Sequence, residues 1–297
     1  MSDQKLDKIR REIEDIGALP TLPEIPMKIL EVIAKEDSSM QDVAKIIERD
    51  PSLAANILKV ANSPYYGVRQ KVATLQLALT ILGLTEIINT VTSLSVVHMF
   101  PLHGGGAGLD RLAFWRHSFG CAAASQMLAR ELRFDTDGVE FVAGLIHDIG
   151  KLIIDQYFPA KMKSIHTLRQ KQGLSLQEAE VKALGVDHAT LGSWLAENWN
   201  LPPTLVESIL YHHRPLDVLA LAPPSRNPAL TAIIHLADML ASEPESEAER
   251  QNSFADALAW KIILAERADL TKESVNQLVG KYEEYRERVD ALIQAVA

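Results

Sequence analysis

The sequence of 297 residues predicts an all-α protein, and three observations support that fold class. Apolar residues recur at spacings of three and four along most of the chain, which is the period of an amphipathic helix. Capping residues and prolines stand where such runs begin, as at Asp50 and Pro51, and both are typical of a first helical turn. No segment shows the sustained alternation of apolar and polar residues that indicates a strand.

The first hundred residues contain a series of expected helices. Leu6 and Ile9 begin an apolar face near the N-terminus, and Ser38 and Ser39 offer a cap for a later helix. Gly83 separates the last two helices of the series, because glycine is favoured where a helix ends. The expected ranges are 4–17, 19–36 (with prolines at the helix start), 40–50, 51–63, 72–82 and 85–100.

A glycine-rich segment, residues 101–110, is the clearest linker, because clustered glycines remove backbone restraint. It divides an expected N-terminal lobe (1–107) from a second helical lobe (108–245), and terminal helices (246–297) are expected to pack on the core. Thr271 caps the last of these. The expected helices after the linker are 112–132, 138–158, 175–198, 203–212, 228–241, 249–267 and 271–296.

Charge and cysteine content exclude several classes of function. Thirty Lys and Arg against 39 Asp and Glu give a net charge of −9, which argues against nonspecific binding of nucleic acid or anionic membrane. One cysteine, Cys121, excludes an internal disulfide network and a cysteine-rich metal site. The N-terminus lacks the apolar region of a signal peptide, and polar residues interrupt the most apolar stretch, 75–97. We therefore expect a cytoplasmic protein, and any metal must be held by histidine and carboxylate.

The segment 144–151 (GLIHDIGK) carries the strongest chemical signal. His147 and Asp148 follow an apolar run that begins at Phe141, so they are expected at the end of a buried helix. Imidazole and carboxylate are good ligands for divalent first-row metals, and an aspartate can bridge two ions. A cation would also relieve the cost of burying the carboxylate.

Further histidines and one further aspartate lie on other expected helices of the same region. Their side chains could converge on one bundle interior, as ligands do in helix-bundle metal sites. The complete candidate set of metal ligands is His117, His147, Asp148, His188, His212, His213 and Asp238.

Each candidate also has a purely structural interpretation. A single helical histidine is more often a core or surface residue than a ligand. His212 and His213 suit the C-terminal end of a helix, where the dipole favours them, and Asp238 could pair with His235 one turn before it. The histidines assigned to structural or surface roles are His98, His103, His166 and His235.

The order of the candidate ligands resembles that of the HD superfamily of metal-dependent phosphohydrolases. The segment 144–151, with Lys151, is typical of its HD-GYP branch. Other segments resemble a sister group, the HDOD domain, and the likeness extends over roughly residues 18–240. The HDOD-like segments are 19–23 (LPTLP), 50–64 (DPSLAANILKVANSP), 75–84 (LQLALTILGL), 115–118 (WRHS) and 199–202 (WNLP).

This resemblance implies an HD-superfamily helical bundle with an N-terminal lobe of the HDOD type, and two metal ions. The residues implied to hold the first ion are His117, His147, Asp148 and Asp238. Those implied to hold the second are Asp148, His188, His212 and His213. Asp148 and Lys151 are the implied catalytic residues, with Lys151 facing a phosphate or a bridging hydroxide. A ligand set without thiolate suits iron, which we favour, or manganese or zinc.

The sequence departs from the HD-GYP pattern at two places. HD-GYP phosphodiesterases follow their histidine pair with a glutamate and a Gly-Tyr-Pro signature, whereas Arg214 and Pro215 follow the pair here. Hydrolysis of cyclic-di-GMP is therefore not expected. Some relatives bind a third metal through a glutamate one turn before the first histidine, but Ala113 occupies that position.

The leading functional hypothesis is a bacterial signal-transduction protein of the HDOD group that retains a binuclear site. Its partner would be a signalling protein or a small phosphorylated ligand. The alternative is an active metal-dependent phosphohydrolase, a phosphodiesterase or nucleotidase, in which two ions about 4 Å apart assist displacement at phosphorus. A di-iron oxygenase and a scaffold with a structural metal site are further alternatives. DNA binding by helices 40–62 is not expected, because the second carries only Lys59 and the chain is acidic.

Overall fold

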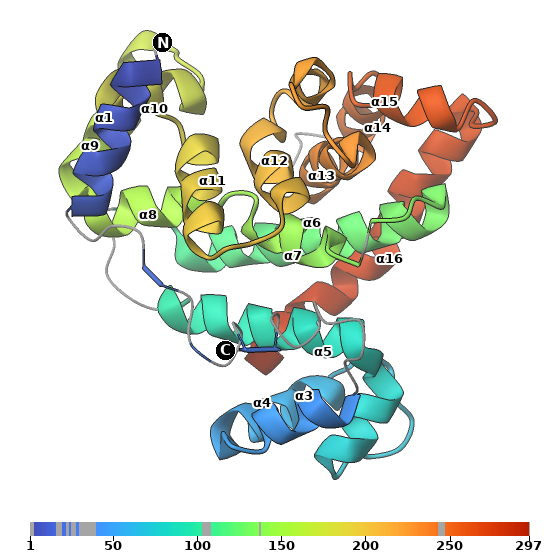
Figure 1. The fold of residues 1–297 in the computed structure, drawn as a ribbon. Coiled ribbons are helices and arrows are strands. Elements are labelled where there is room, and N and C mark those ends of the chain that lie inside the picture. Colours follow the sequence, from blue (N-terminus) through green and yellow to red (C-terminus); the bar gives the residue numbers. More distant parts are fainter. Residues whose placement is uncertain are drawn as a thin grey trace. The chain divides into compact units, whose positions relative to one another are not determined.

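The computed structural model describes residues 3–15, 20–21, 24, 28–29, 40–102, 108–136, 138–242 and 247–296. All regular elements in these residues are helices, so the predicted all-α class is confirmed (Figure 1). The expected helix in 19–36, the caps Ser38 and Ser39, residues 103–107 of the linker and His103 lie wholly or largely outside the described residues.

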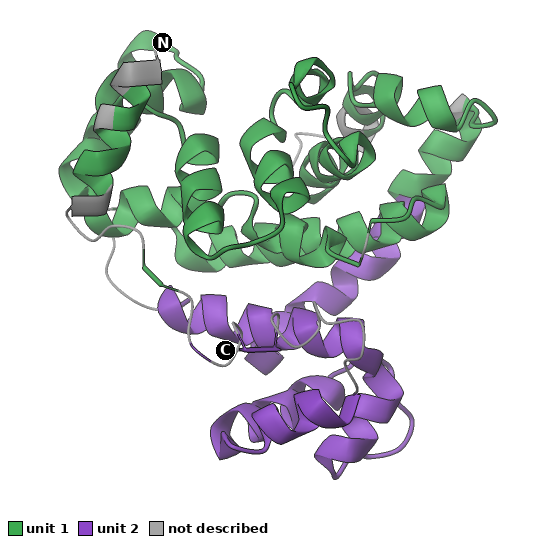
Figure 2. Cartoon of the chain, in the orientation of Figure 1, with its two compact units in different colours: residues 1–21, 103–279 green, residues 22–102, 280–297 purple. Residues whose placement is uncertain are grey.

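The chain forms two compact units (Figure 2). The first unit consists of Met1–Thr21 and His103–Val279, and the second of Leu22–Leu102 and Gly280–Ala297. Each unit therefore combines two separate stretches of the chain. The functional lobes expected at 1–107, 108–245 and 246–297 are consecutive stretches and stay a prediction.

The second unit contains α3 (Met40–Ile47), α4 (Pro51–Ala61), α5 (Leu75–Met99) and the C-terminal part of α16 (Lys272–Val296). Asp50 caps α4, because its carboxylate accepts hydrogen bonds from the backbone N–H groups of Ser52 and Leu53 at 3.0 Å. Asn62 follows α4 and exchanges two hydrogen bonds with the backbone of Val72 at 2.8 and 2.9 Å. The polar residues of segment 50–64 thus begin one helix and tie down the loop that leaves it.

Replacement of Asp50 by alanine is expected to lower the free energy of unfolding by about 1 kcal/mol, because two N–H groups at the start of α4 lose their acceptor. Urea denaturation followed by circular dichroism measures the change. Asp50→Asn is the matched control and should remain near the wild type, since asparagine caps as well as aspartate. Equal stability of the alanine and asparagine variants would contradict the capping role.

Helix α5 is interrupted at Gly83, whose φ of 78° and ψ of 170° are not helical. Glycine adopts a positive φ without the steric cost that other residues meet. The two helices predicted at 72–82 and 85–100 are therefore both present, although the first begins at Leu75, after its cap Thr74.

By length and composition α5 as a whole is apolar enough to cross a membrane, but half of its most apolar stretch of 18 residues is buried inside the protein. The break at Gly83 also leaves each half shorter than the roughly 20 residues a span requires.

The first unit contains the remaining helices. They are α1 (Asp3–Asp15), α6 (Arg111–Leu132), α7 (Glu140–Ile146), α8 (Ile149–Tyr157), α9 (Pro159–Gln172), α10 (Leu176–Leu184), α11 (His188–Asn198), α12 (Pro203–Tyr211), the 3-10 helix η1 (Pro215–Ala220), α13 (Pro228–Ala241), α14 (Glu247–Ala255) and α15 (Trp260–Glu266). Helix α6 packs against α7 and α13, and α11 packs against α8 and α12. The helix predicted at 138–158 is two helices, α7 and α8, and that predicted at 175–198 is α10 and α11. Helix α9 has no counterpart among the helices expected from the sequence.

Two contacts bring the helices of the first unit close together. Gly150, in the first turn of α8, lies so near α11 that a Cβ atom there would stand 2.0 Å from the carbonyl oxygen of His188. Arg111, at the start of α6, forms a buried ion pair with Asp155 of α8 at 3.2 Å, and the same carboxylate accepts from the backbone of Leu109. These contacts fix α8 between α6 and α11.

Helix α1 contacts α11 within the first unit through Arg10. The Arg10 guanidinium donates to Glu197 at 2.6 Å and lies 5.7 Å from the ring centre of Trp194. Farther along, the Trp199 indole donates to the carbonyl oxygen of Pro20 at 2.7 Å. This last bond joins the segments 19–23 and 199–202, which are far apart in the sequence.

Candidate metal centre

The seven predicted metal ligands all lie in the first unit. His117 is on α6, His147 and Asp148 join α7 to α8, and His188 begins α11. His212 and His213 follow α12, and Asp238 is on α13. The structure brings them into two groups, in each of which the potential ligand atoms lie within 4.8 Å of one another. The groups are Asp148, His188, His212, His213, and His117, His147, Asp238.

Asp148 lies between the two groups and presents one carboxylate oxygen to each. Its Oδ2 is 3.7 Å from His117 Nε2 and 3.4 Å from His147 Nε2. Its Oδ1 is 3.1 Å from His188 Nε2 and 3.6 Å from His212 Nε2. A carboxylate placed in this way can bridge two cations.

The remaining contacts complete each group. In the first, His117 Nε2 lies 3.1 Å from Asp238 Oδ1 and 3.3 Å from His147 Nε2. In the second, the Nε2 atoms of His188 and His213 are 2.9 Å apart. Ring nitrogens that face one another so closely suit ligands that share a cation.

The protein fixes the orientation of two of these rings through their other nitrogen. The Nδ1 atoms of His147 and His212 lie 2.7 and 2.6 Å from the backbone carbonyl oxygens of Gly144 and Ile209. A carbonyl oxygen can only accept, so each Nδ1 carries the hydrogen and each Nε2 presents a lone pair to the site. Outer partners of this kind orient metal-binding histidines.

Two buried atoms support the fit of a cation to these residues. Asp148 Oδ1 and His212 Nε2 are fully buried and have no hydrogen-bond partner in the described part of the chain. A buried acceptor without a partner costs free energy. A metal ion held by the group of Asp148, His188, His212 and His213 would satisfy both atoms, which is why we regard the donor set as suited to a metal.

Electrostatics favour a positive charge at this place. Burial alone raises the pKa of Asp148, but Lys151 and His147 outweigh it and hold the pKa well below its usual range. Burial lowers the pKa of His188, but Asp148 and Glu180 outweigh it and raise the pKa to about 9. Burial and the neighbouring His212 lower the pKa of His213, which keeps that imidazole neutral. Asp148 and His213 therefore already have the forms that bind metal ions, whereas His188 would release its proton when it binds one.

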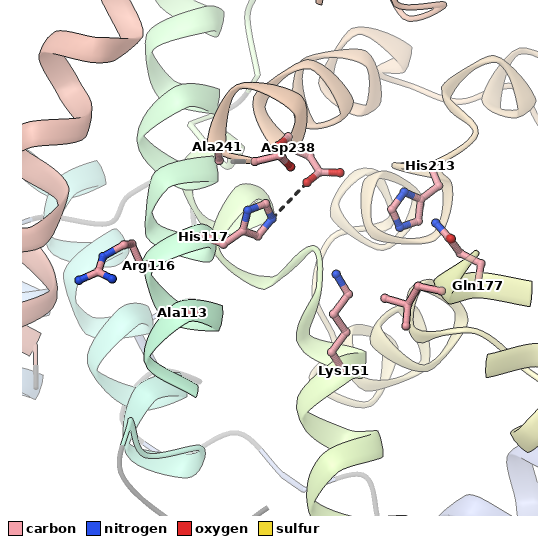
Figure 3. A pocket seen from close by; sticks show the side chains of 10 residues that line it. Ala113, Arg116, His117, Lys151, Gln177, His213, Asp238 and Ala241 are labelled. Carbon is pink, nitrogen blue, oxygen red and sulfur yellow. Dashed lines mark hydrogen bonds and ion pairs between the residues drawn. The ribbon is translucent and has the colours of Figure 1, made fainter. Parts of the chain in front are cut away.

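A pocket of about 490 Å³ opens beside the two groups (Figure 3). His117, His213 and Asp238 line it, so ligands from both groups reach its surface. Lys151 extends into the same space, and its ammonium group contacts Asp148 Oδ2. The pocket therefore joins a cationic side chain to the bridging carboxylate. Ala113, at the position of the third-metal glutamate in some relatives of the resembled family, is also part of its lining.

The other histidines lie elsewhere. His235 Nδ1 is 2.6 Å from the carbonyl oxygen of His212, so its recorded partner is a backbone atom rather than Asp238. His98 and His166 are exposed.

Glu180, which is buried on α10 and contacts His188, is not among the site residues predicted from the sequence. Its place eight residues before His188 carries no recognisable motif, since the contact depends on how α10 packs beside α11.

Comparisons with known proteins give consistent results. The family model described as the HDOD domain matches residues 19–215, and Asp238 lies beyond this match. An uncharacterised protein of Treponema pallidum is 22% identical over 218 residues, which make up 71% of this chain and 40% of that protein. The chain thus spans less than half the length of this curated relative.

Two solved structures share the fold over almost the whole chain. An HDOD domain protein of unknown function from Geobacter sulfurreducens is 26% identical with a TM-score of 0.80, covering 96% of this chain and 97% of that chain. A Shewanella amazonensis protein, provisionally named a phosphohydrolase, is 26% identical with a TM-score of 0.72, covering 94% and 97%.

Proposed function

The chain belongs to the HDOD family, and we propose that it is a bacterial signal-transduction protein that uses a binuclear metal centre to bind a small phosphorylated ligand. The ions would be held by the seven residues of the candidate metal centre, with iron favoured over manganese or zinc. We place the protein in the cytoplasm.

One observation carries this proposal. The two oxygens of Asp148 face different groups of histidines. A carboxylate that only formed a salt bridge would not need to face both groups. The ligand is inferred from the adjoining pocket, because Lys151 supplies a cationic donor for phosphate within reach of both groups. A bound pair of ions would add positive charge that attracts phosphoryl oxygens. His117, His213 and Asp238 would hold the ions at the pocket wall.

Elemental analysis of protein purified in air and under nitrogen tests the metal centre. We expect about two first-row metal ions per chain under at least one condition. A chain that contains no such metal after purification, and binds none when Fe²⁺, Mn²⁺ or Zn²⁺ is added, would contradict the proposal.

Lys151→Met is expected to weaken binding of inorganic phosphate to the metal-loaded protein about 10-fold or more, because a hydrogen bond to a charged group is lost. Isothermal titration calorimetry measures the change. Lys163→Met, which removes an exposed lysine on α9, is the control and should bind as the wild type does. Equal phosphate affinity in the two variants would show that Lys151 does not bind the phosphate.

A second candidate function is hydrolysis of a phosphoester, favoured by the access that the pocket gives to ligands of both groups. In that case Asp148 and Lys151 would be the catalytic residues. A panel of phosphomonoesters and phosphodiesters with Mn²⁺ or Fe²⁺ distinguishes the two candidates. Turnover that Asp148→Asn abolishes would favour the enzyme, whereas phosphate binding without turnover would favour the signalling protein.

A further inference from the structure

Glu180 makes two contacts with one predicted metal ligand. Its Oε2 lies 2.7 Å from His188 Nδ1 and accepts a hydrogen bond from the backbone N–H of the same residue at 2.9 Å. His188 Nε2, on the opposite side of the ring, faces Asp148 and His213. The imidazole of His188 therefore lies between the Glu180 carboxylate and the candidate metal position.

The burial of Glu180 calls for a compensating charge. Its side chain is 2% exposed, and a buried carboxylate is costly unless it is paired. If Glu180 served only to accept hydrogen bonds from His188, an uncharged glutamine could take its place, because its amide oxygen is of the same size. The N-terminus of α11 also has its own cap, because Asp187 accepts from the backbone N–H of Thr190 at 2.9 Å. Capping alone thus does not account for a buried charge at position 180.

Among the candidate ligands, two other rings have a partner at Nδ1, and in both cases that partner is uncharged. His147 and His212 lie against backbone carbonyl oxygens, whereas His188 lies against a carboxylate. An anionic partner increases the basicity of the ligating nitrogen more than a carbonyl does, and such outer partners contribute 10–100-fold to metal affinity. His188 is therefore the strongest donor of these three rings.

The two groups also differ in exposure. In the group of Asp148, His188, His212 and His213 only His213 is partly exposed, whereas in the other group only His147 is buried. The side chains of His117 and Asp238 are 23% and 19% exposed at the pocket. A drier environment strengthens the attraction between a cation and its anionic ligands. Burial and the carboxylate partner thus favour the same group.

We propose that Glu180 is a positioning residue that orients His188 and makes the group of Asp148, His188, His212 and His213 the tighter of two unequal metal positions. The inference rests on the proposed function, because it assumes that the chain binds metal. Glu180 acts through His188 and is itself neither one of the candidate ligands nor one of the residues that line the pocket.

Titration of metal-free protein with Co²⁺ tests this inference, since the visible spectrum of Co²⁺ reports its ligands. Wild-type protein should bind a first ion tightly and a second more weakly. Glu180→Gln keeps the acceptor oxygen but removes the charge, and it should weaken the tight position at least 10-fold. The weaker position should change less, and the spectrum of the first ion should shift.

Glu140→Gln is the matched control, because Glu140 is also a buried carboxylate of the first unit but accepts from Thr136 at 2.5 Å. Its Co²⁺ affinities should equal those of the wild type, and circular dichroism confirms folding of both variants. Should Glu180→Gln fail to fold, Glu180→Asp replaces it, and its shorter reach should also weaken the tight position.

The outcomes separate the two proposals. Tight Co²⁺ binding that is the same in the wild type and the Glu180 variant would overturn the role of Glu180 and leave the metal centre intact. An equal loss in Glu140→Gln would also overturn it, by showing that any buried carboxylate has the same effect. A wild type that binds no Co²⁺ would instead overturn the metal centre itself.

Discussion

Asp148→Asn is expected to reduce the metal content of the purified protein from about two ions per chain to fewer than one. The affinity should fall by more than about 100-fold, because outer partners alone contribute 10–100-fold and Asp148 faces the metal positions directly. Asparagine has nearly the same size, but it has no charge and only one acceptor oxygen. It can therefore face one group of histidines and not the other.

Asp217→Asn is the matched control for this experiment. Asp217 is exposed and pairs with Arg214 at 3.5 Å, close in sequence to the histidine pair but outside both groups. Inductively coupled plasma mass spectrometry of the wild type and both variants gives the metal content directly. If Asp148→Asn retained two ions per chain, the assignment of Asp148 as a bridging ligand would be wrong.

Gly150→Ala is expected to lower the free energy of unfolding by about 3 kcal/mol. The new methyl group would stand 2.0 Å from the carbonyl oxygen of His188 and 2.7 Å from its carbon, and both are backbone atoms that cannot rotate away. Helices α8 and α11 would have to separate, which would also displace His188 from Asp148. For a unit of this size the midpoint of thermal unfolding should fall by about 6–12 °C, and bound metal should fall with it.

Gly280→Ala provides the control in a helix with free space. In the described part of the chain, nothing other than the helix's own backbone and the adjacent residues lies within 4 Å of a Cβ at Gly280. Alanine is preferred to glycine inside a helix by about 0.5–1 kcal/mol. This variant should be as stable as the wild type or slightly more stable. A Gly150→Ala protein with an unchanged midpoint would show that α8 and α11 do not approach as closely as the structure has them.

The fold class could be predicted from the sequence because helical periodicity and capping are local properties. Asp50 and Gly83 each act on the backbone within a few residues, and both mark helix boundaries in the structure as expected. The break between α7 and α8 could not be predicted in this way. The apolar period continues through residues 141–154, and the helix ends at Ile146 where His147 and Asp148 turn toward the other ligands.

The candidate site could be predicted only as a set of residues. Histidine and aspartate types and their order indicated seven ligands, and the structure brings all seven into two groups. Their division around Asp148 was implied by a resemblance rather than by spacing. Glu180 was missed because its role depends on a contact between α10 and the first residue of α11, and tertiary packing of this kind leaves no period in the sequence.

The docking of α1 on α11 has a consequence for the order in which the chain folds during synthesis. Arg10 and Glu197 are separated by 187 residues, so α1 leaves the ribosome long before its partner exists. At about 5–20 residues per second the delay is roughly 10–40 s. Through that interval α1 cannot form its native contacts with α11, and it is accessible to chaperones or to other nascent chains. The first unit, which holds every predicted metal ligand, can complete itself only after the second unit's residues 22–102 have been made.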